Sequence, residues 1–120
     1  KKLAGPTVSF KGWATDEEIR DHYRRCRALI FPGEEDYGIV PIEVQGCGRP
    51  VIAYGVGGAL ETVVEGTTGV FFRSPTVDAI IKALHRAESI AWDPARIRAH
   101  AERFSEPRFR QEFSRLIRNL

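Results

Sequence analysis

The chain has 120 residues, a length that supports one hydrophobic core and therefore one domain. Hydrophobic residues make up 42% and charged residues 28%, as in ordinary folded proteins, and no low-complexity tract indicates disorder. No apolar run approaches the roughly 20 residues that cross a bilayer, and the net charge of +2 is too small to indicate nucleic-acid binding by itself. We therefore expect a cytoplasmic globular domain.

The first third of the chain predicts a strand, a helix and a second strand. Residues 7–10 are a short strand candidate, and Thr15 with Glu18 has the capping-box pattern that opens a helix. Three apolar residues of this helix recur with helical spacing and are expected to pack inward: Ile19, Tyr23 and Cys26. The continuous apolar run at 28–31 predicts a strand covered on both faces.

The rest of the chain repeats this alternation. A helix is expected from Val40-Pro41 to Gly48, with an apolar face of Val40, Val44 and Cys47. Strands are predicted near 50–54 and 70–72, with a short helix around 59–64 between them. The helix that Ser74-Pro75 opens is expected to turn four residues to the core: Val77, Ile80, Ile81 and Leu84. Further helices begin at Asp93-Pro94 and Ser105.

Strands that alternate with helices predict the fold class. Parallel strands need helical crossovers, so this order indicates an α/β protein with a Rossmann-like parallel sheet covered by helices on both faces. Cys26 and Cys47 are expected to be reduced, buried thiols, and the three histidines, His22, His85 and His100, to be surface residues. The spacing of His and Cys indicates no metal site.

The loop after the strand at 28–31 is the richest candidate site. In an open parallel sheet, ligands bind beyond the carboxyl ends of the strands. The amides of Gly38, Ile39 and Val40 precede or begin a helix, a position suited to phosphate oxygens. Glu43 lies in the first turn, where its carboxylate can accept from two neighbouring hydroxyls. These groups are complementary to the phosphate and ribose of a nucleotide.

The sequence of this region resembles that of a known family. Glu35 and Glu43, eight residues apart, look like the Glu-x7-Glu motif of family 4 retaining glycosyltransferases, which have two Rossmann-like domains in the GT-B fold. The resemblance continues through the glycine and Pro-Val strand at 46–53, the Gly-Gly loop at 57–63 and the Glu-Gly-x-x-Gly turn at 65–69. It extends from about Val8 to Phe72.

The resemblance implies roles for the motif residues. Glu43 would bind the ribose hydroxyls of a sugar nucleotide, and Glu35 would hydrogen-bond the transferred sugar as the catalytic-site residue. Gly38, Ile39 and Val40 would offer amides to the diphosphate or the sugar. The chain would be part of the C-terminal, donor-binding domain, spanning residues 1–120. The acceptor domain and the first strands of this domain, with their Arg and Lys for the diphosphate, would lie before it.

This loop departs from the family pattern at two positions, and two of its features have alternative interpretations. Tyr37 stands where the family usually has Phe, and Gly33 lies near the family's serine. Read alone, Glu43 is also an ordinary first-turn carboxylate that complements the helix dipole. The acidic run at 34–36 permits a metal site as an alternative to a solvated loop. The resemblance implies no metal and no cofactor, because GT-B enzymes do without an essential divalent ion.

Rival functions remain open at this point. They are a non-catalytic nucleotide-sugar binding module, an epimerase that would need an acid or base absent here, and a nucleic-acid module supported only by seven arginines in residues 92–120. The loop at 57–63 resembles that of mannosyl-type enzymes using GDP-mannose. The expected partners are a nucleotide-diphosphate sugar, a sugar or lipid-linked acceptor, and the missing N-terminal domain. No nucleic acid is expected, and the chain is placed in the cytoplasm, with peripheral contact at the inner face of the membrane.

Overall fold

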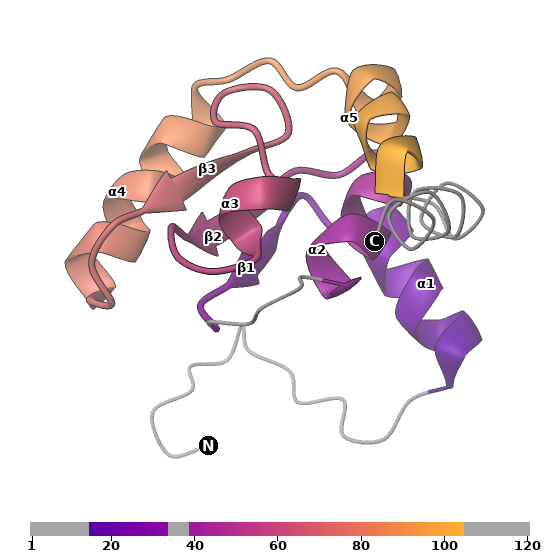
Figure 1. Cartoon of the computed structure of the whole chain (residues 1–120), viewed down its shortest axis with the longest axis horizontal. Helices are drawn as coiled ribbons and strands as arrows, with labels where there is room; N and C mark the ends of the chain where they lie inside the picture. The colour runs from indigo at the N-terminus through magenta and orange to yellow at the C-terminus, as the bar shows by residue number, and fades with distance from the viewer. Residues whose placement is uncertain (1–14, 34–38, 105–120) are drawn as a thin grey trace, which may run out of the picture.

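A computed structural model describes residues 15–33 and 39–104, which form helices around a small sheet (Figure 1). The elements in chain order are α1 (Asp16–Arg25), β1 (Leu29–Phe31), α2 (Ile39–Gly46), β2 (Val51–Tyr54), α3 (Ala59–Thr62), β3 (Gly69–Phe72), α4 (Val77–Glu88), α5 (Pro94–Ala101) and a 3-10 turn (Glu102–Phe104). No helix in the described ranges is long and apolar enough to span a membrane.

The sheet is parallel, with the order β1-β2-β3. Leu29 pairs with Val51, and Val51 pairs with Gly69, so the first residues of the three strands are in register. This confirms the predicted α/β class and the strands near 28–31, 50–54 and 70–72. The predicted strand at 7–10 and the helix from Ser105 lie outside the described residues.

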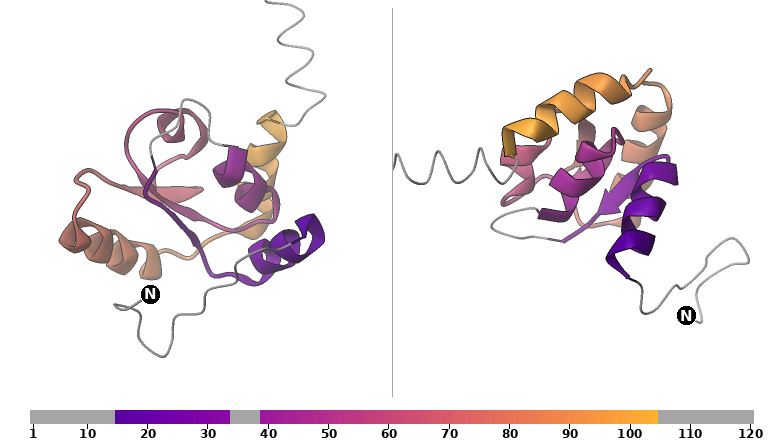
Figure 2. Two further views of the ribbon diagram at one scale, coloured as in Figure 1. Left: turned by 90° about the horizontal axis from the view of Figure 1, so that it is seen from below. Right: turned by 90° about the vertical axis from the view of Figure 1, so that its right-hand side faces the viewer.

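Helices cover both faces of the sheet (Figure 2). On one face, Val51 and Ala53 pack with Val44 of α2 and with Ala59 and Val63 of the α3 region. On the other face, the intervening strand residues pack against α4; this cluster consists of Ile52, Val70, Phe72, Ala83 and Ala87. The alternation of side chains along β2 and β3 therefore supplies two separate cores. The prediction that the strand at 28–31 is covered on both faces is wrong for β1, because Ile30, on the α4 face, is 44% exposed.

Local capping fixes where the helices begin. Thr15 accepts from the amide of Glu18 at 3.1 Å, as the capping box predicts, and Asp93 accepts from two amides at the start of α5. The cap of α4 is Thr76, which accepts from the amide of Ala79, so the helix starts two residues later than Ser74-Pro75 predicted. Each cap satisfies amides that the first helical turn leaves without intrahelical partners.

The inward face of α4 differs from the predicted one. Ala83 and Ala87 are buried, whereas Val77 and Ile81 are 71% and 43% exposed. The helix packs through Ile80, Ala83, Leu84 and Ala87, which have the same helical spacing as the predicted set. Apolar periodicity fixed the helix but left two candidate faces, and the small alanines allow the close approach to the sheet.

The outer edge of β3 is occupied by side chains. Phe71 donates its amide to Glu65 Oε2 at 2.7 Å, and its carbonyl accepts from Arg86 of α4. Arg86 and Glu65 also approach each other at 3.9 Å. The two charged groups therefore take the positions that a further strand would occupy beside Phe71.

Gly69 begins β3 at a point of close backbone approach. A Cβ at this position would overlap the carbonyl oxygen of Val51 and lie 2.7 Å from Val63 Cγ1. The preceding turn uses Gly66 with a φ of +83°, in the left-handed region that favours glycine. The two glycines of the Glu-Gly-x-x-Gly turn are therefore needed for different reasons: Gly69 for the close backbone contact and Gly66 for its positive φ.

Candidate functional site

The candidate site lies where β1 ends and α1 and α2 begin. All three strands run in the same direction, so their carboxyl ends, Phe31, Tyr54 and Phe72, share one edge of the sheet. Helix α1 ends just before β1 starts, and α2 starts after β1 ends, so the N-termini of both helices lie toward that edge. This is the edge at which open parallel sheets bind ligands.

The structure describes only some of the predicted site residues. Ile39 and Val40 are the first two residues of α2, and Glu43 lies one turn further on with an exposed side chain. Glu35 and Gly38 lie outside the described residues, so their positions relative to Glu43 stay predictions. The predicted start of this helix near Val40-Pro41 is confirmed to within two residues.

A cavity of about 510 Å³ lies between α1 and α2 and includes Glu43. Its lining comes from one face of each helix: Asp16, Ile19, Arg20 and Tyr23 of α1, and Val40, Glu43 and Cys47 of the α2 side. Both sets follow i, i+3 or i+4, and i+7 spacing, which places them on facing stripes. The cavity is therefore lined by two carboxylates, a guanidinium and a phenol. Its other lining residues are Ile19, Val40 and Cys47, which we call its apolar floor.

The charge of Glu43 reaches Tyr23. Partial burial raises the pKa of the Tyr23 phenol above its ordinary value of 10.0, and the negative charge of Glu43 raises it further. The phenol therefore stays neutral at physiological pH and can donate a hydrogen bond. A carboxylate acceptor and a phenol donor on opposite walls can bind a diol, and the apolar floor can contact a planar ring.

The walls of the cavity are tied together at the far end of α1. Arg49 donates from Nε and Nη2 to the carbonyl of Arg24, at 2.9 and 2.6 Å. This satisfies a carbonyl in the last turn of α1, whose intrahelical partner is missing. Within α2, buried Gln45 donates to the Pro41 carbonyl at 3.0 Å. The Arg49 bonds connect the segment after α2 to the end of the helix that carries Tyr23.

Comparison with known proteins identifies the family. The family described as "Glycosyl transferases group 1" matches residues 1–104. The chain belongs to this family. A D-inositol 3-phosphate glycosyltransferase of Streptomyces bingchenggensis is 34% identical over 105 residues, which cover 81% of this chain and 22% of that protein. The corresponding enzyme of Gordonia bronchialis is 39% identical over 103 residues, 82% of this chain and 22% of its own.

A solved structure of this fold supports the same assignment. The crystal structure of Anabaena HepE in complex with UDP-glucose is similar with a TM-score of 0.63 and 25% identity, over 82% of this chain and 29% of that one. The resemblance to GT-B glycosyltransferases is thereby confirmed. The chain spans about a fifth of the length of the curated relatives it matches, 22% in both of the two named above.

The contribution of α1 to the cavity was not predicted from the sequence. Sequence reasoning assigned Ile19 and Tyr23 to a packing stripe and placed no α1 residue in the site. Tyr23 is half-buried and packs against the core, but it also lines the cavity. The usable signal was the spacing of the two charged residues: Asp16 lies three residues before Ile19 and Arg20 three before Tyr23, which places all four on one stripe of α1.

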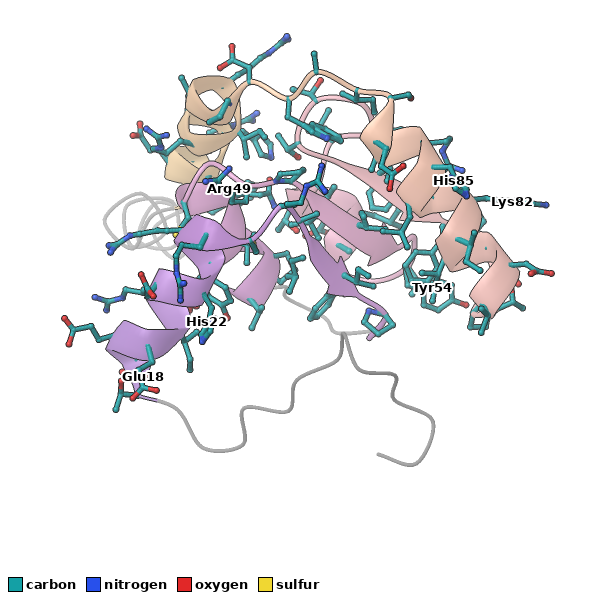
Figure 3. All side chains as sticks on the ribbon, turned by 180° about the vertical axis from the view of Figure 1, so that it is seen from behind. Glu18, His22, Arg49, Tyr54, Lys82 and His85 are labelled. Atoms are coloured by element: carbon teal, nitrogen blue, oxygen red, sulfur yellow. The ribbon has the colours of Figure 1, made fainter. Side chains whose placement is uncertain are left out.

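Other predictions about side chains are corrected here. Cys26 and Cys47 are free thiols, as expected, but they are half-buried rather than buried. His22 and His85 are exposed (Figure 3), whereas His100 is half-buried. The Nε2 atom of His100 lies 2.9 Å from the Thr62 carbonyl oxygen. No cluster of three metal-ligating side chains occurs within residues 15–33 and 39–104. The acidic run at 34–36 lies outside these ranges.

Proposed function

We propose that the full protein transfers a sugar from a nucleoside diphosphate donor to an acceptor hydroxyl, and that this chain binds the nucleotide part of the donor. The observation that carries this proposal is the cavity between α1 and α2, where Glu43 faces a neutral Tyr23. Glu43 accepts from the ribose hydroxyls, and the base lies against the apolar floor. Membership of the group 1 family supports a transferase.

The other motif residues complete this proposal, and of these Glu35 and Gly38 lie outside the described ranges. Glu35 hydrogen-bonds the transferred sugar, and the amides of Gly38, Ile39 and Val40 bind the diphosphate or the sugar, with the N-terminus of α2 favouring negative charge. The acceptor hydroxyl attacks the anomeric carbon on the face that the nucleotide leaves. A carbon–oxygen bond forms to the acceptor, the bond to phosphate breaks, and a phosphate oxygen takes the proton. The product retains its configuration.

The donor's base and sugar are a separate part of the proposal. The loop at 57–63 resembles that of enzymes using GDP-mannose, whereas the solved neighbour holds UDP-glucose. We propose GDP-mannose as the first donor to test. Titration of the full-length protein with GDP-mannose, UDP-glucose and an ADP-sugar separates the choices. The acceptor is a sugar or lipid-linked hydroxyl, and the relatives' printed names suggest a phosphorylated inositol as a probe.

The test of the nucleotide site compares two glutamates in the full-length protein. Glu43→Ala should weaken binding of the free nucleoside diphosphate roughly 10- to 150-fold, because hydrogen bonds to a charged group contribute about 1.5 to 3 kcal/mol. Glu35→Ala should leave this affinity nearly unchanged and lower kcat, because the free nucleotide lacks the sugar. Glu17→Ala, an exposed α1 carboxylate outside the cavity lining, is the matched control.

A deoxynucleotide makes the assignment sharper. Wild-type protein should prefer the ribonucleotide over its 2′,3′-dideoxy analogue, and Glu43→Ala should abolish that preference. Equal affinity of Glu35→Ala and Glu43→Ala for the nucleoside diphosphate, or a preserved ribose preference in Glu43→Ala, would refute the proposed site. Nucleotide binding without any transfer to an acceptor would favour the non-catalytic binding module instead.

A further inference from the structure

We infer that Arg73 is a phosphate-binding residue at the edge of the sheet that holds the donor site. Arg73 directly follows β3, and Gly55 directly follows β2. The Gly55 amide donates to the Phe72 carbonyl at 3.0 Å, so the two strand ends are joined at this point. Residue 73 therefore lies at the carboxyl end of the sheet, the edge at which β1 also ends.

The guanidinium of Arg73 is held by packing. Its carbon lies 5.1 Å from the centroid of the buried Phe71 ring, a distance at which a cation is attracted to the ring face. On the other side it occupies the space that a side chain at position 55 would need. A Cβ on Gly55 would lie 2.8 Å from Nη1 and 3.4 Å from Cζ of Arg73. Glycine at 55 therefore makes room for this cation.

Among the residues that the structure describes, the N–H groups of the Arg73 side chain have no hydrogen-bond partner. The two ion pairs there join Arg25 with Asp21 and Arg86 with Glu65, and no side-chain hydrogen bond there involves Arg73. Its side chain is exposed. A planar guanidinium that is fixed by its neighbours and keeps its N–H groups for a ligand matches the geometry of a phosphate oxygen pair.

A phosphate bound at this edge needs positive charge from the protein. The loop after β1 carries three consecutive carboxylates at 34–36, which would repel a phosphate unless cations offset them. The sequence alone shows no obvious pair of cations for this role. β3 is two strands away from β1, a separation of about 10 Å, which exceeds the Debye length of about 8 Å at physiological salt. Arg73 therefore acts on a phosphate bound near the end of β3 and is largely screened from charges at the end of β1. Arg73 supplies positive charge where the proposed reaction needs it.

This inference rests on the proposed function. The bound phosphate belongs either to the donor's diphosphate or to a phosphorylated acceptor. The experiment uses the full-length protein and calorimetric titration with matched ligand pairs. GDP is compared with guanosine, UDP with uridine, and D-inositol 3-phosphate with inositol. The variants are Arg73→Gln, Arg73→Lys and, as a control, Lys82→Gln, an exposed cation on α4 (Figure 3).

Arg73→Gln should weaken one phosphorylated ligand roughly tenfold or more, while its phosphate-free partner changes little. Arg73→Lys should restore part of the loss. Gly55→Ala, which displaces the guanidinium without removing it, should act in the same direction. An effect on GDP or UDP identifies the donor as the source, and an effect on D-inositol 3-phosphate identifies the acceptor.

Unchanged affinity for every phosphorylated ligand in Arg73→Gln would overturn the inference, as would equal losses for a ligand and its phosphate-free partner. A lower melting temperature alone would mean that Arg73 only packs on Phe71. Failure of the proposed function would differ, because the wild-type protein would then bind neither GDP nor UDP. Inorganic pyrophosphate, which lacks base and ribose, still tests Arg73 in that case, and equal binding by wild type and Arg73→Gln would overturn it.

Discussion

The close approach at the start of β3 predicts a large cost for adding one methyl group. In Gly69→Ala the new Cβ would overlap the Val51 carbonyl oxygen and press on Val63, and both belong to the packed core. Because backbone atoms of two paired strands are involved, the contact cannot be relieved by a change of rotamer. β3 must move away from β2, which strains two hydrogen bonds: Val51 to Thr68 at 3.1 Å and Gly66 to Gly69 at 2.8 Å.

The magnitude follows from these two contributions. Overpacking of a core costs about 1 to 3 kcal/mol, and each weakened hydrogen bond costs about 1 kcal/mol. We therefore expect Gly69→Ala to lower the free energy of unfolding by about 3 to 5 kcal/mol, a large part of the 5 to 15 kcal/mol typical of domains. Urea unfolding followed by circular dichroism measures this change.

Two other glycines separate sterics from backbone conformation. Gly66 has a φ of +83° and open space around it, so Gly66→Ala should cost only about 1 to 2 kcal/mol. Gly46, at the end of α2, also has open space and no positive φ, so Gly46→Ala should stabilise by about 0.5 to 1 kcal/mol. If Gly69→Ala unfolds with the same free energy as Gly66→Ala, the reasoning from backbone contact is wrong.

Three further predictions concern packing, helix ends and pH. Ile97 of α5 is fully buried, so Ile97→Ala should cost about 2 to 5 kcal/mol, measured by urea unfolding. Arg49→Met should remove the bonds to the Arg24 carbonyl, cost about 1 kcal/mol and speed amide exchange in the last turn of α1; unchanged exchange there would contradict the role given to Arg49. The raised pKa of Tyr23 means that the unfolded chain loses this proton first, so stability is full below pH 10 and falls as the pH rises above it. Tyr23→Phe should show a smaller fall, and Glu43→Gln should lower the Tyr23 pKa in an ultraviolet titration.

The order of strands and helices could be predicted because it depends on local signals. The apolar run at 28–31 and the Pro-Val strand at 50–54 each have strand length, and caps such as Thr15 mark helix starts. The inward face of α4 could not be predicted, because two stripes carry apolar residues and only the sheet decides between them. Ile81 and Val77 were assigned to the core on periodicity alone, and both are exposed.

The residues of the candidate site also differ in whether the local sequence could predict them. Glu43 was found from its place in a motif that follows a strand, which is a local property of the chain. Tyr23 and Arg73 reach the functional edge only through packing between distant segments. Tyr23 lies across the cavity from α2, and Arg73 contacts Gly55 where the neighbouring strands β3 and β2 end. Nothing in the spacing of residues 23 and 43, or 55 and 73, indicates that they approach each other.

The side chains on the outer edge of β3 affect how this protein meets other chains. An edge strand normally offers a row of unpaired amides and carbonyls, which is a template for another strand and a route to aggregation. Here the outward amide and carbonyl of Phe71 already bind Glu65 and Arg86. An incoming strand would have to displace both charged groups and leave them without these partners. We expect the Glu65→Ala, Arg86→Ala double variant to form intermolecular β-structure on mild heating, at a temperature where the wild-type protein stays dispersed.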